Sequence, residues 1–160
     1  MDCLHCHLKN RRNAVKDVGT IKSNMLFIFE SPTKADDVTG EICSGQDRRL
    51  LQLFLKEVGK DCNDFYATCL IHCLPVDRHD IYIEPNEIEI LTCLPNVLKV
   101  LQQPNFKYVF YIGKLVEKYL MKVFIGIPLI PFGLITKQGG QDSYWYMHNV
   151  RKIKEAVDGS

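Results

Sequence analysis

The residues with the clearest chemical potential are two cysteines at the start of the chain, Cys3 and Cys6, in the fragment CLHC. Two thiols separated by two residues can turn both sulfurs toward one point. That arrangement suits a metal ion, a redox disulfide or an iron–sulfur cluster. A metal ion or a cluster would need further ligands from later in the chain.

Two later cysteines are placed to complete such a set. Cys73 ends an apolar run in IHCLP and Cys93 lies in a helical pattern in EILTCLP, so the loop between them can bring both sulfurs to the first pair. One CxxC pair with two separated cysteines fits a [4Fe–4S] cluster, and spacing alone leaves zinc as the alternative. Both residues could also be ordinary buried thiols, which is our interpretation of Cys43, Cys62 and Cys69.

Composition limits the class of protein. The chain has 160 residues, a mass of 18.4 kDa and 46% hydrophobic residues, which predicts one compact domain over residues 1–160. We expect no membrane contact, because no apolar run reaches transmembrane length and the polar Cys/His-rich start has no apolar core like that of a signal peptide. We also expect a monomer. The expected location is intracellular, either cytoplasmic or nuclear, and the protein is not expected to be secreted. In such a reducing compartment, cysteines are metal ligands or buried thiols more often than disulfides.

Hydrophobic patterning predicts alternating strands and helices. Apolar runs indicate strands at 24–29, 64–72, 107–113 and 127–132, and helical spacing indicates helices at 47–59, 85–101, 114–124 and 149–157. This alternation is typical of a single-domain three-layer α/β/α sandwich with a central, mainly parallel four-stranded sheet.

Parallel sheets carry their sites beyond the carboxyl ends of the strands. That rule selects Glu30 after the first strand, Gly113 after the third, and three residues at the end of the second strand: Cys69, His72 and Cys73.

Several segments, in this order, resemble one family: CLHCHLKNRRNAV, NMLFIFESPTKADDVTGEICSGQDRRLLQLFLKEVG, FYATCLIHCLP, EPNEIEILTCLPNVL and KYVFYIGK. The chain is similar to the iron–sulfur uracil-DNA glycosylases, families 4 and 5 of the uracil-DNA glycosylase superfamily, over about residues 3 to 120. The most specific matches are the order of the cysteines and Gly40–Leu51, which aligns with the family pattern Gly-x-Pro-Phe-x-Gly-x-x-Gly-x-x-Leu. The resemblance implies a [4Fe–4S] cluster on Cys3, Cys6, Cys73 and Cys93, in preference to zinc.

The predicted base pocket departs from the family pattern. The family's Gly-Glu-Ala-Pro-Gly is replaced by Phe29-Glu30-Ser31-Pro32-Thr33, which keeps the acid and the proline but neither glycine. Cys43 stands where the family has a phenylalanine that stacks on uracil, and Cys69 where it has an asparagine that reads the base edge. The pocket residues implied by the resemblance are Phe29, Ser31, Pro32, Cys43 and Cys69.

Breaking an N-glycosidic bond requires an extruded base, stabilisation of the departing base and a positioned water. The resemblance assigns Glu30 to orient that water, and a turn-capping carboxylate is the alternative. The family's His-Pro-Ser segment has no clear match, so His148, followed by Asn149, is the nearest candidate for the donor to the base, against a plain surface histidine.

Basic residues gather locally although the net charge is only +1. The predicted phosphate contacts are Arg11, Arg12, Arg151 and Lys152, and a solvated surface is the alternative. Tyr144, Trp145 and Tyr146 would stack on bases or belong to the core. Asp36 and Asp37 are interpreted as a solvated acidic turn or a helix start.

Two hypotheses follow, with DNA as the partner in the first. The chain is either a DNA glycosylase that hydrolyses the bond to uracil or another modified base, or a non-catalytic DNA-binding or protein-interaction module that keeps the fold and the cluster. The retained Glu30 favours the enzyme. The residues at 29, 43 and 69 favour the module.

Overall fold

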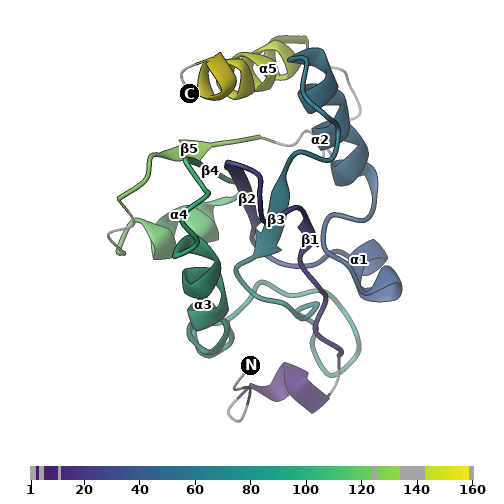
Figure 1. The fold of residues 1–160 in the computed structure, drawn as a ribbon. Helices are drawn as coiled ribbons and strands as arrows, with labels where there is room; N and C mark the ends of the chain where they lie inside the picture. The colour runs from purple at the N-terminus through teal and green to yellow at the C-terminus, as the bar shows by residue number, and fades with distance from the viewer. Residues whose placement is uncertain (1–2, 4–5, 11, 124–125, 134–142, 159–160) are drawn as a thin grey trace.

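The computed structural model describes residues 3, 6–10, 12–123, 126–133 and 143–158 (Figure 1). The strands are β1 (Val18–Gly19), β2 (Met25–Phe29), β3 (Tyr66–Cys69), β4 (Tyr108–Tyr111) and β5 (Leu129–Pro131). The helices are a 3-10 helix (His7–Asn10), α1 (Lys34–Thr39), α2 (Gln46–Glu57), α3 (Glu87–Leu101), α4 (Lys114–Leu120) and α5 (Ser143–Asp158).

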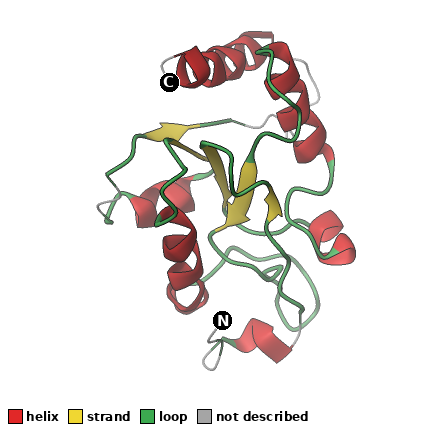
Figure 2. Cartoon of the chain, in the orientation of Figure 1, coloured by secondary structure: helices red, strands yellow, loops and turns green. Residues whose placement is uncertain are grey.

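The strands form one sheet in the order β1-β3-β2-β4-β5, with β2 at its centre. β2 pairs in parallel with β3 and β4, and β4 pairs in parallel with β5. Only β1 among the described strands runs antiparallel to its neighbour, β3. Figure 2 shows the helices on both sides of this sheet.

The alternation of side chains along β2 explains the three layers. Met25, Phe27 and Phe29 face the α2-side core, which the sheet shares with α2 and α5. Leu26 and Ile28 face the α3-side core, which the sheet shares with α3 and α4. Because both faces of β2 are covered, its sequence is a continuous apolar run, as expected for a buried parallel strand.

Aromatic rings fill the α2-side core next to the central strands. The Phe27 ring stacks on Phe110 with centroids 4.7 Å apart, and Phe132 meets both rings edge to face at 5.4 and 5.6 Å. Each such contact contributes about 0.5 to 1.5 kcal/mol beyond area burial. This packing holds β2, β4 and the segment after β5 together.

The predicted fold class is confirmed, with one strand more than expected. The additional strand, β1, has two residues, too few to produce a periodic pattern. Its pairing needs a glycine, because Gly19 has a φ of 96° and a Cβ there would overlap the Phe65 carbonyl. Helix α1 has only six residues, and the sequence analysis indicated it only as one of two interpretations of Asp36 and Asp37. None of the described helices is both long and apolar enough to cross a lipid bilayer.

Candidate functional site

The topology marks one place in the sheet as the site. β2 and β4 are neighbours, but the chain leaves β2 toward β3 through α1 and α2, and leaves β4 toward β5 through α4. Their connections therefore diverge over opposite faces, and ligands of open α/β sheets bind where such connections separate. Glu30 follows β2 directly, and Gly113 closes the turn after β4.

The Glu30 side chain is held across this switch point. Its Oε1 accepts a hydrogen bond of 3.0 Å from the backbone N–H of Leu115, in the first turn of α4. The N-cap residue of α4 is Gly113, which has no side chain to cap the helix, so Glu30 supplies the cap from another strand. The carboxylate packs against Gly113, where a Cβ would collide with it.

The cap on α4 uses only one of the two carboxylate oxygens of Glu30. The side chain is partly exposed, and among the described residues no hydrogen bond to Oε2 is found. The backbone is held as well, because the Glu30 carbonyl accepts a hydrogen bond of 3.2 Å from Ile71. Glu30 thus caps a distant helix, whereas the alternative interpretation had it cap the turn after its own strand. Within the described part of the chain, its second oxygen is left to contact a ligand.

The predicted pocket residues are brought together but are buried. Phe29, Cys43 and Cys69 all lie in the α2-side core and are 6%, 2% and 0% exposed. Pro32 is buried and Ser31 is partly exposed. Burial and the nearby Asp47 raise the pKa of Cys43 to about 12, and burial raises the pKa of Cys69 well above its ordinary value. Both thiols are therefore neutral.

Asp36 organises the loop that carries Cys43, a role that the sequence analysis missed. Its Oδ1 accepts hydrogen bonds of 2.8 Å from the backbone N–H and the hydroxyl of Ser44, and its Oδ2 accepts one of 2.8 Å from the Thr33 N–H. Asp36 is 2% exposed, so the expectation of a solvated turn is wrong, and that of a helix start is right. The pattern Thr-x-x-Asp before a helix would have revealed it.

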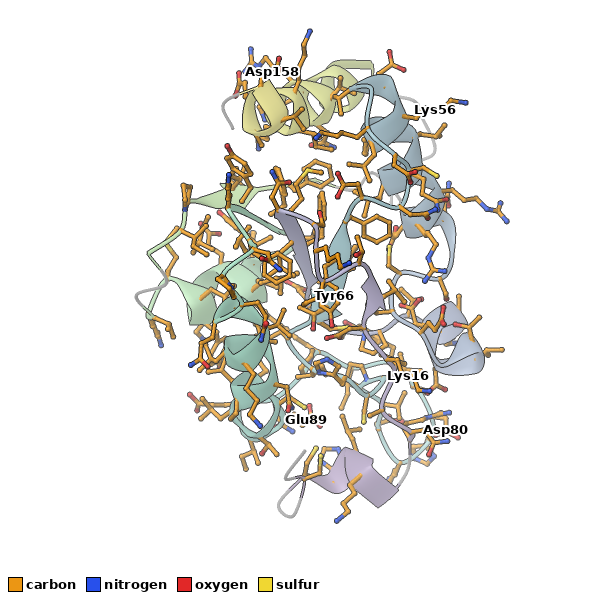
Figure 3. All side chains as sticks on the ribbon, in the orientation of Figure 1. Lys16, Lys56, Tyr66, Asp80, Glu89 and Asp158 are labelled. Atoms are coloured by element: carbon orange, nitrogen blue, oxygen red, sulfur yellow. The ribbon has the colours of Figure 1, made fainter. Side chains whose placement is uncertain are left out.

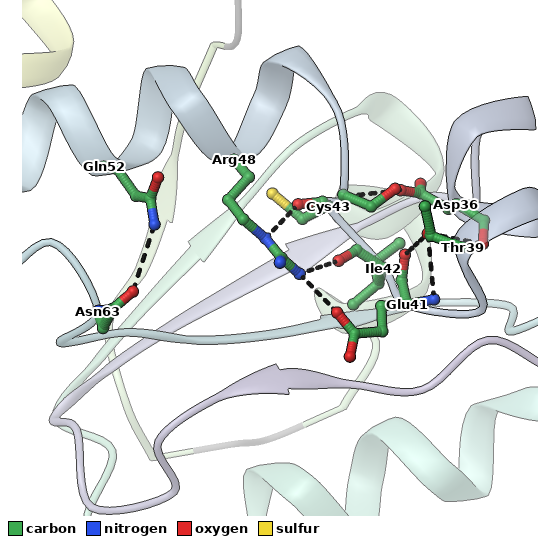
Figure 4. Close-up of polar contacts among 9 residues, drawn as sticks. Asp36, Thr39, Glu41, Ile42, Cys43, Arg48, Gln52 and Asn63 are labelled. Atoms are coloured by element: carbon green, nitrogen blue, oxygen red, sulfur yellow. Dashed lines mark hydrogen bonds and ion pairs between the residues drawn. The ribbon is translucent and has the colours of Figure 1, made fainter.

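Arg48 of α2 holds the other side of this loop (Figure 4). Its Nε donates a hydrogen bond of 2.8 Å to the Cys43 carbonyl, and its guanidinium also reaches the Ile42 carbonyl at 3.2 Å. Cys43 has a left-handed backbone with a φ of 53°, which is unusual for a residue other than glycine. Contacts from α1 and α2 thus maintain a strained loop beside the switch point.

The four predicted ligand cysteines gather on the opposite face. Cys6, Cys73 and Cys93 are buried in the α3-side core, and Cys3 packs against it. Burial raises the pKa of Cys73 to about 12, and the sulfurs of Cys93, Cys6 and Cys3 act in the same direction. The four sulfurs are therefore near enough to disfavour one another's negative charge.

This mutual repulsion is what a bound cation relieves, so the donor set fits a metal group. Burial raises the pKa of Cys6, whereas the N–H groups of Leu8 and Lys9, in the 3-10 helix, lower it by hydrogen bonding to its sulfur. Such N–H donors are typical of thiolates in iron–sulfur sites. The described residues contain no ready-made group of three or more metal ligands, so the geometry indicates a donor set and not a finished site.

An acidic residue connects two segments that carry the four predicted ligand cysteines, Cys3, Cys6, Cys73 and Cys93, which together are called the cysteine centre below. Glu89 of α3 is fully buried, and its Oε1 lies 3.0 Å from Nε2 of His7, the residue after Cys6. Figure 3 shows Glu89 at the end of α3 nearest the N-terminal segment. Its other oxygen accepts a hydrogen bond of 2.9 Å from the Asn86 N–H, so the pattern Asn-x-x-Glu signals its position.

His72 is the second polar group of the centre. Its Nε2 lies 3.0 Å from Asp17 Oδ1 and 3.3 Å from the Thr68 hydroxyl. Burial alone would lower the pKa of His72, but the hydrogen bond to Asp17 and the neighbouring Cys93 sulfur raise it to about 9. Asp17 lies 55 residues away in the sequence, and no local pattern announces this pairing.

The predicted phosphate-binding residues differ in exposure and in the ion pairs or hydrogen bonds that they already make. The Arg12 guanidinium pairs with Asp37 at 3.0 Å and Asp80 at 2.9 Å, and its side chain is 24% exposed. Lys152 donates a hydrogen bond to the Pro131 carbonyl. Arg151 is 69% exposed and lies 3.5 Å from Glu155. Arg11 lies outside the described residues.

The remaining candidates lie on α5, which packs against α2. His148 is half buried and makes contacts of its own, and Asn149 is fully buried and donates a hydrogen bond to the Gly133 carbonyl. The aromatic side chains at 144–146 lie outside the described part of the structure.

No protein-family model matches the chain, but individual relatives do. A type-4 uracil-DNA glycosylase from Saccharolobus solfataricus is 31% identical over 122 residues, which cover 75% of this chain and 55% of the relative. That of Archaeoglobus fulgidus is 26% identical, covering 78% and 61%. That of Sulfurisphaera tokodaii is 28% identical, covering 91% and 63%. The match thus spans less than two thirds of each relative.

The fold agrees with the sequence comparison. The solution structure of a Methanosarcina acetivorans protein, proposed to be a uracil DNA glycosylase, superposes with a TM-score of 0.59 at 8% identity. The superposition covers 91% of this chain and 98% of that protein. With the sequence matches and the parallel α/β sheet together, the chain belongs to the uracil-DNA glycosylase superfamily and is similar to its type-4 members.

Proposed function

We propose that this chain is a DNA glycosylase that hydrolyses the N-glycosidic bond of uracil or another modified base in DNA. The observation that carries the proposal is the position of Glu30, a partly exposed carboxylate at the switch point with one oxygen held by Leu115. Relatives named as uracil-DNA glycosylases support an enzyme rather than a non-catalytic module of the same fold.

In this proposal Glu30 orients the attacking water and offsets positive charge on the sugar. A carboxylate whose orientation is already set needs little reorganisation when charge develops. His148 is proposed as the donor to the departing base, and Arg151, which is mostly exposed, as a contact to a DNA phosphate.

The pocket residues argue for slow excision of uracil. Cys43 offers no aromatic face, and the loss of base stacking costs about 1 to 3 kcal/mol. Cys69 is a weak hydrogen-bonding partner for the base edge. Both side chains are almost wholly buried, so they contribute shape to the site and no polar contact. We therefore propose that another modified base is the better substrate.

A panel of oligonucleotides, each carrying uracil or one other modified pyrimidine, tests the activity. We expect release of at least one base, with uracil among the slower substrates. Glu30→Gln should reduce the rate about 100-fold or more, the scale of a positioned acid–base group. Its amide oxygen can still accept the Leu115 hydrogen bond, so the melting temperature should change little. Absence of release from every substrate, or full activity in Glu30→Gln, contradicts the proposal.

We further propose that Cys3, Cys6, Cys73 and Cys93 hold a [4Fe–4S] cluster, with zinc as the alternative. When bound, the cluster would join the N-terminal segment to the residues after β3 and to α3, because these three parts carry the four cysteines. Protein purified without air should be brown and contain about four irons. Cys73→Ala or Cys93→Ala should bleach it. Stoichiometric zinc, or no metal, would overturn the assignment.

A further inference from the structure

His72 is a buried polar residue that the proposed glycosylase chemistry does not use. It is 4% exposed, directly precedes Cys73 and belongs to the turn in which the chain leaves β3. Its carbonyl accepts a hydrogen bond of 2.7 Å from Val15, which ties it to the segment that carries Cys3 and Cys6. His72 therefore touches two parts of the chain that contribute cysteines.

The Nε2 edge of the His72 ring contacts two polar side chains. Nε2 lies between Asp17 Oδ1 at 3.0 Å and the Thr68 hydroxyl at 3.3 Å. Asp17 is held in turn, because its Oδ2 accepts a hydrogen bond of 3.1 Å from the Tyr66 hydroxyl. Two residues of β3 and one from the segment before β1 thus prevent the ring from turning.

The other edge of the ring is buried and open. Nδ1 has no hydrogen-bond partner among the described residues. The Cys93 sulfur is near enough to raise the pKa of the ring. A buried polar atom without a partner is unfavourable, so its presence here calls for an explanation. Cys73 and Cys93 belong to the same α3-side core.

We propose that His72, oriented by Asp17 and Thr68, is a positioning residue for the four predicted ligand cysteines, and that its buried, unpartnered Nδ1 donates to the Cys93 sulfur and so holds that ligand for the metal group. The inference rests on the cluster proposed above. Groups that support metal ligands in this way typically change metal affinity 10- to 100-fold when they are removed.

The test compares iron retention in variants of the anaerobically purified protein. His72→Gln places an amide where Nε2 meets Asp17 but has no group at the Nδ1 edge. We expect iron release to a ferrous chelator to be about 10-fold faster or more, with a changed visible absorption spectrum. Asp17→Asn weakens the hydrogen bond that orients the His72 ring, so its rate of iron release should lie between those of His72→Gln and wild type.

Asp36→Asn is the matched control, because it makes the same change at a buried aspartate of the loop beside Cys43, on the other side of the sheet. It should lower stability without faster iron release and with an unchanged spectrum. If His72→Gln and Asp17→Asn both release iron at the wild-type rate, the inference is wrong. The same holds if Asp36→Asn accelerates release equally, since the effect would then be loss of stability alone.

The iron content of the wild-type protein separates this inference from the cluster proposal. Wild-type protein without iron overturns both. Wild-type protein with about four irons, together with unaffected variants, leaves the cluster in place and removes only the role of His72.

Discussion

At the scale of single residues, the contact between Glu30 and Gly113 links the fold to the proposed chemistry. Gly113→Ala should displace the carboxylate, because the new Cβ would collide with it, and should also strain a backbone with a φ of 104°. We expect about 1 to 3 kcal/mol of destabilisation from the backbone, together with a loss of base excision, measured by urea unfolding and oligonucleotide cleavage.

Gly59 provides the control for this prediction. It also has a positive φ, 76°, but a Cβ there would meet nothing within 4 Å. Gly59→Ala should therefore lose stability through its backbone conformation and keep its activity. Equal activity in the two variants would show that the Glu30–Gly113 contact does not position the carboxylate.

Cysteine reactivity is a second residue-scale prediction. Cys62 is partly exposed, contrary to our expectation of a buried thiol, whereas Cys43 and Cys69 are buried. With a pKa of about 12 for Cys43, only about one molecule in ten thousand carries its thiolate at pH 8. Iodoacetamide should label Cys62 first, as mapped by mass spectrometry. Rapid labelling of Cys43 in folded protein would contradict its burial.

At the scale of elements, two adjacent aspartates of α1 should behave differently. Asp36 accepts three short hydrogen bonds and is buried, whereas Asp37 pairs with Arg12 in a partly exposed position. Asp36→Asn should lower the free energy of unfolding by about 1 to 3 kcal/mol. Asp37→Asn should lower it by about 1 kcal/mol or less. Urea unfolding measures both, and the reverse order would refute the role assigned to Asp36.

At the scale of the whole molecule, Arg12 joins segments far apart in the sequence. It connects the N-terminal segment to α1 through Asp37 and to the loop before α3 through Asp80. Since its charge is already paired, Arg12→Gln should lower stability, by about 1 kcal/mol, and leave the salt dependence of DNA binding unchanged.

The measurement is a titration of DNA binding at several salt concentrations. A phosphate contact contributes about 0.9 to the slope of log affinity against log salt. A slope reduced by that amount in Arg12→Gln would restore the phosphate-binding role predicted from the sequence. Lys9→Gln, at an exposed cation of the same segment, is the control for stability.

The sequence by itself determined the layered fold and the order of the cysteines. Each of the four predicted strands and each long helix is a local pattern: the apolar run of β2 follows from burial on both faces, and the spacing in α2 from burial on one. Asn86, which starts α3, is a local signal too. The segments that resemble the glycosylases could be recognised from the sequence as well, because each motif is a contiguous stretch of residues.

Only the tertiary structure decided which polar groups meet. Glu30 caps a helix 85 residues later, Arg12 reaches an aspartate 68 residues away, and His72 pairs with one 55 residues before it. Periodicity reports whether a side chain is buried and carries no information about its partner. Long-range packing brings such partners together, so the cap on α4, the paired charge of Arg12 and the pairing of His72 with Asp17 all depend on how the layers assemble.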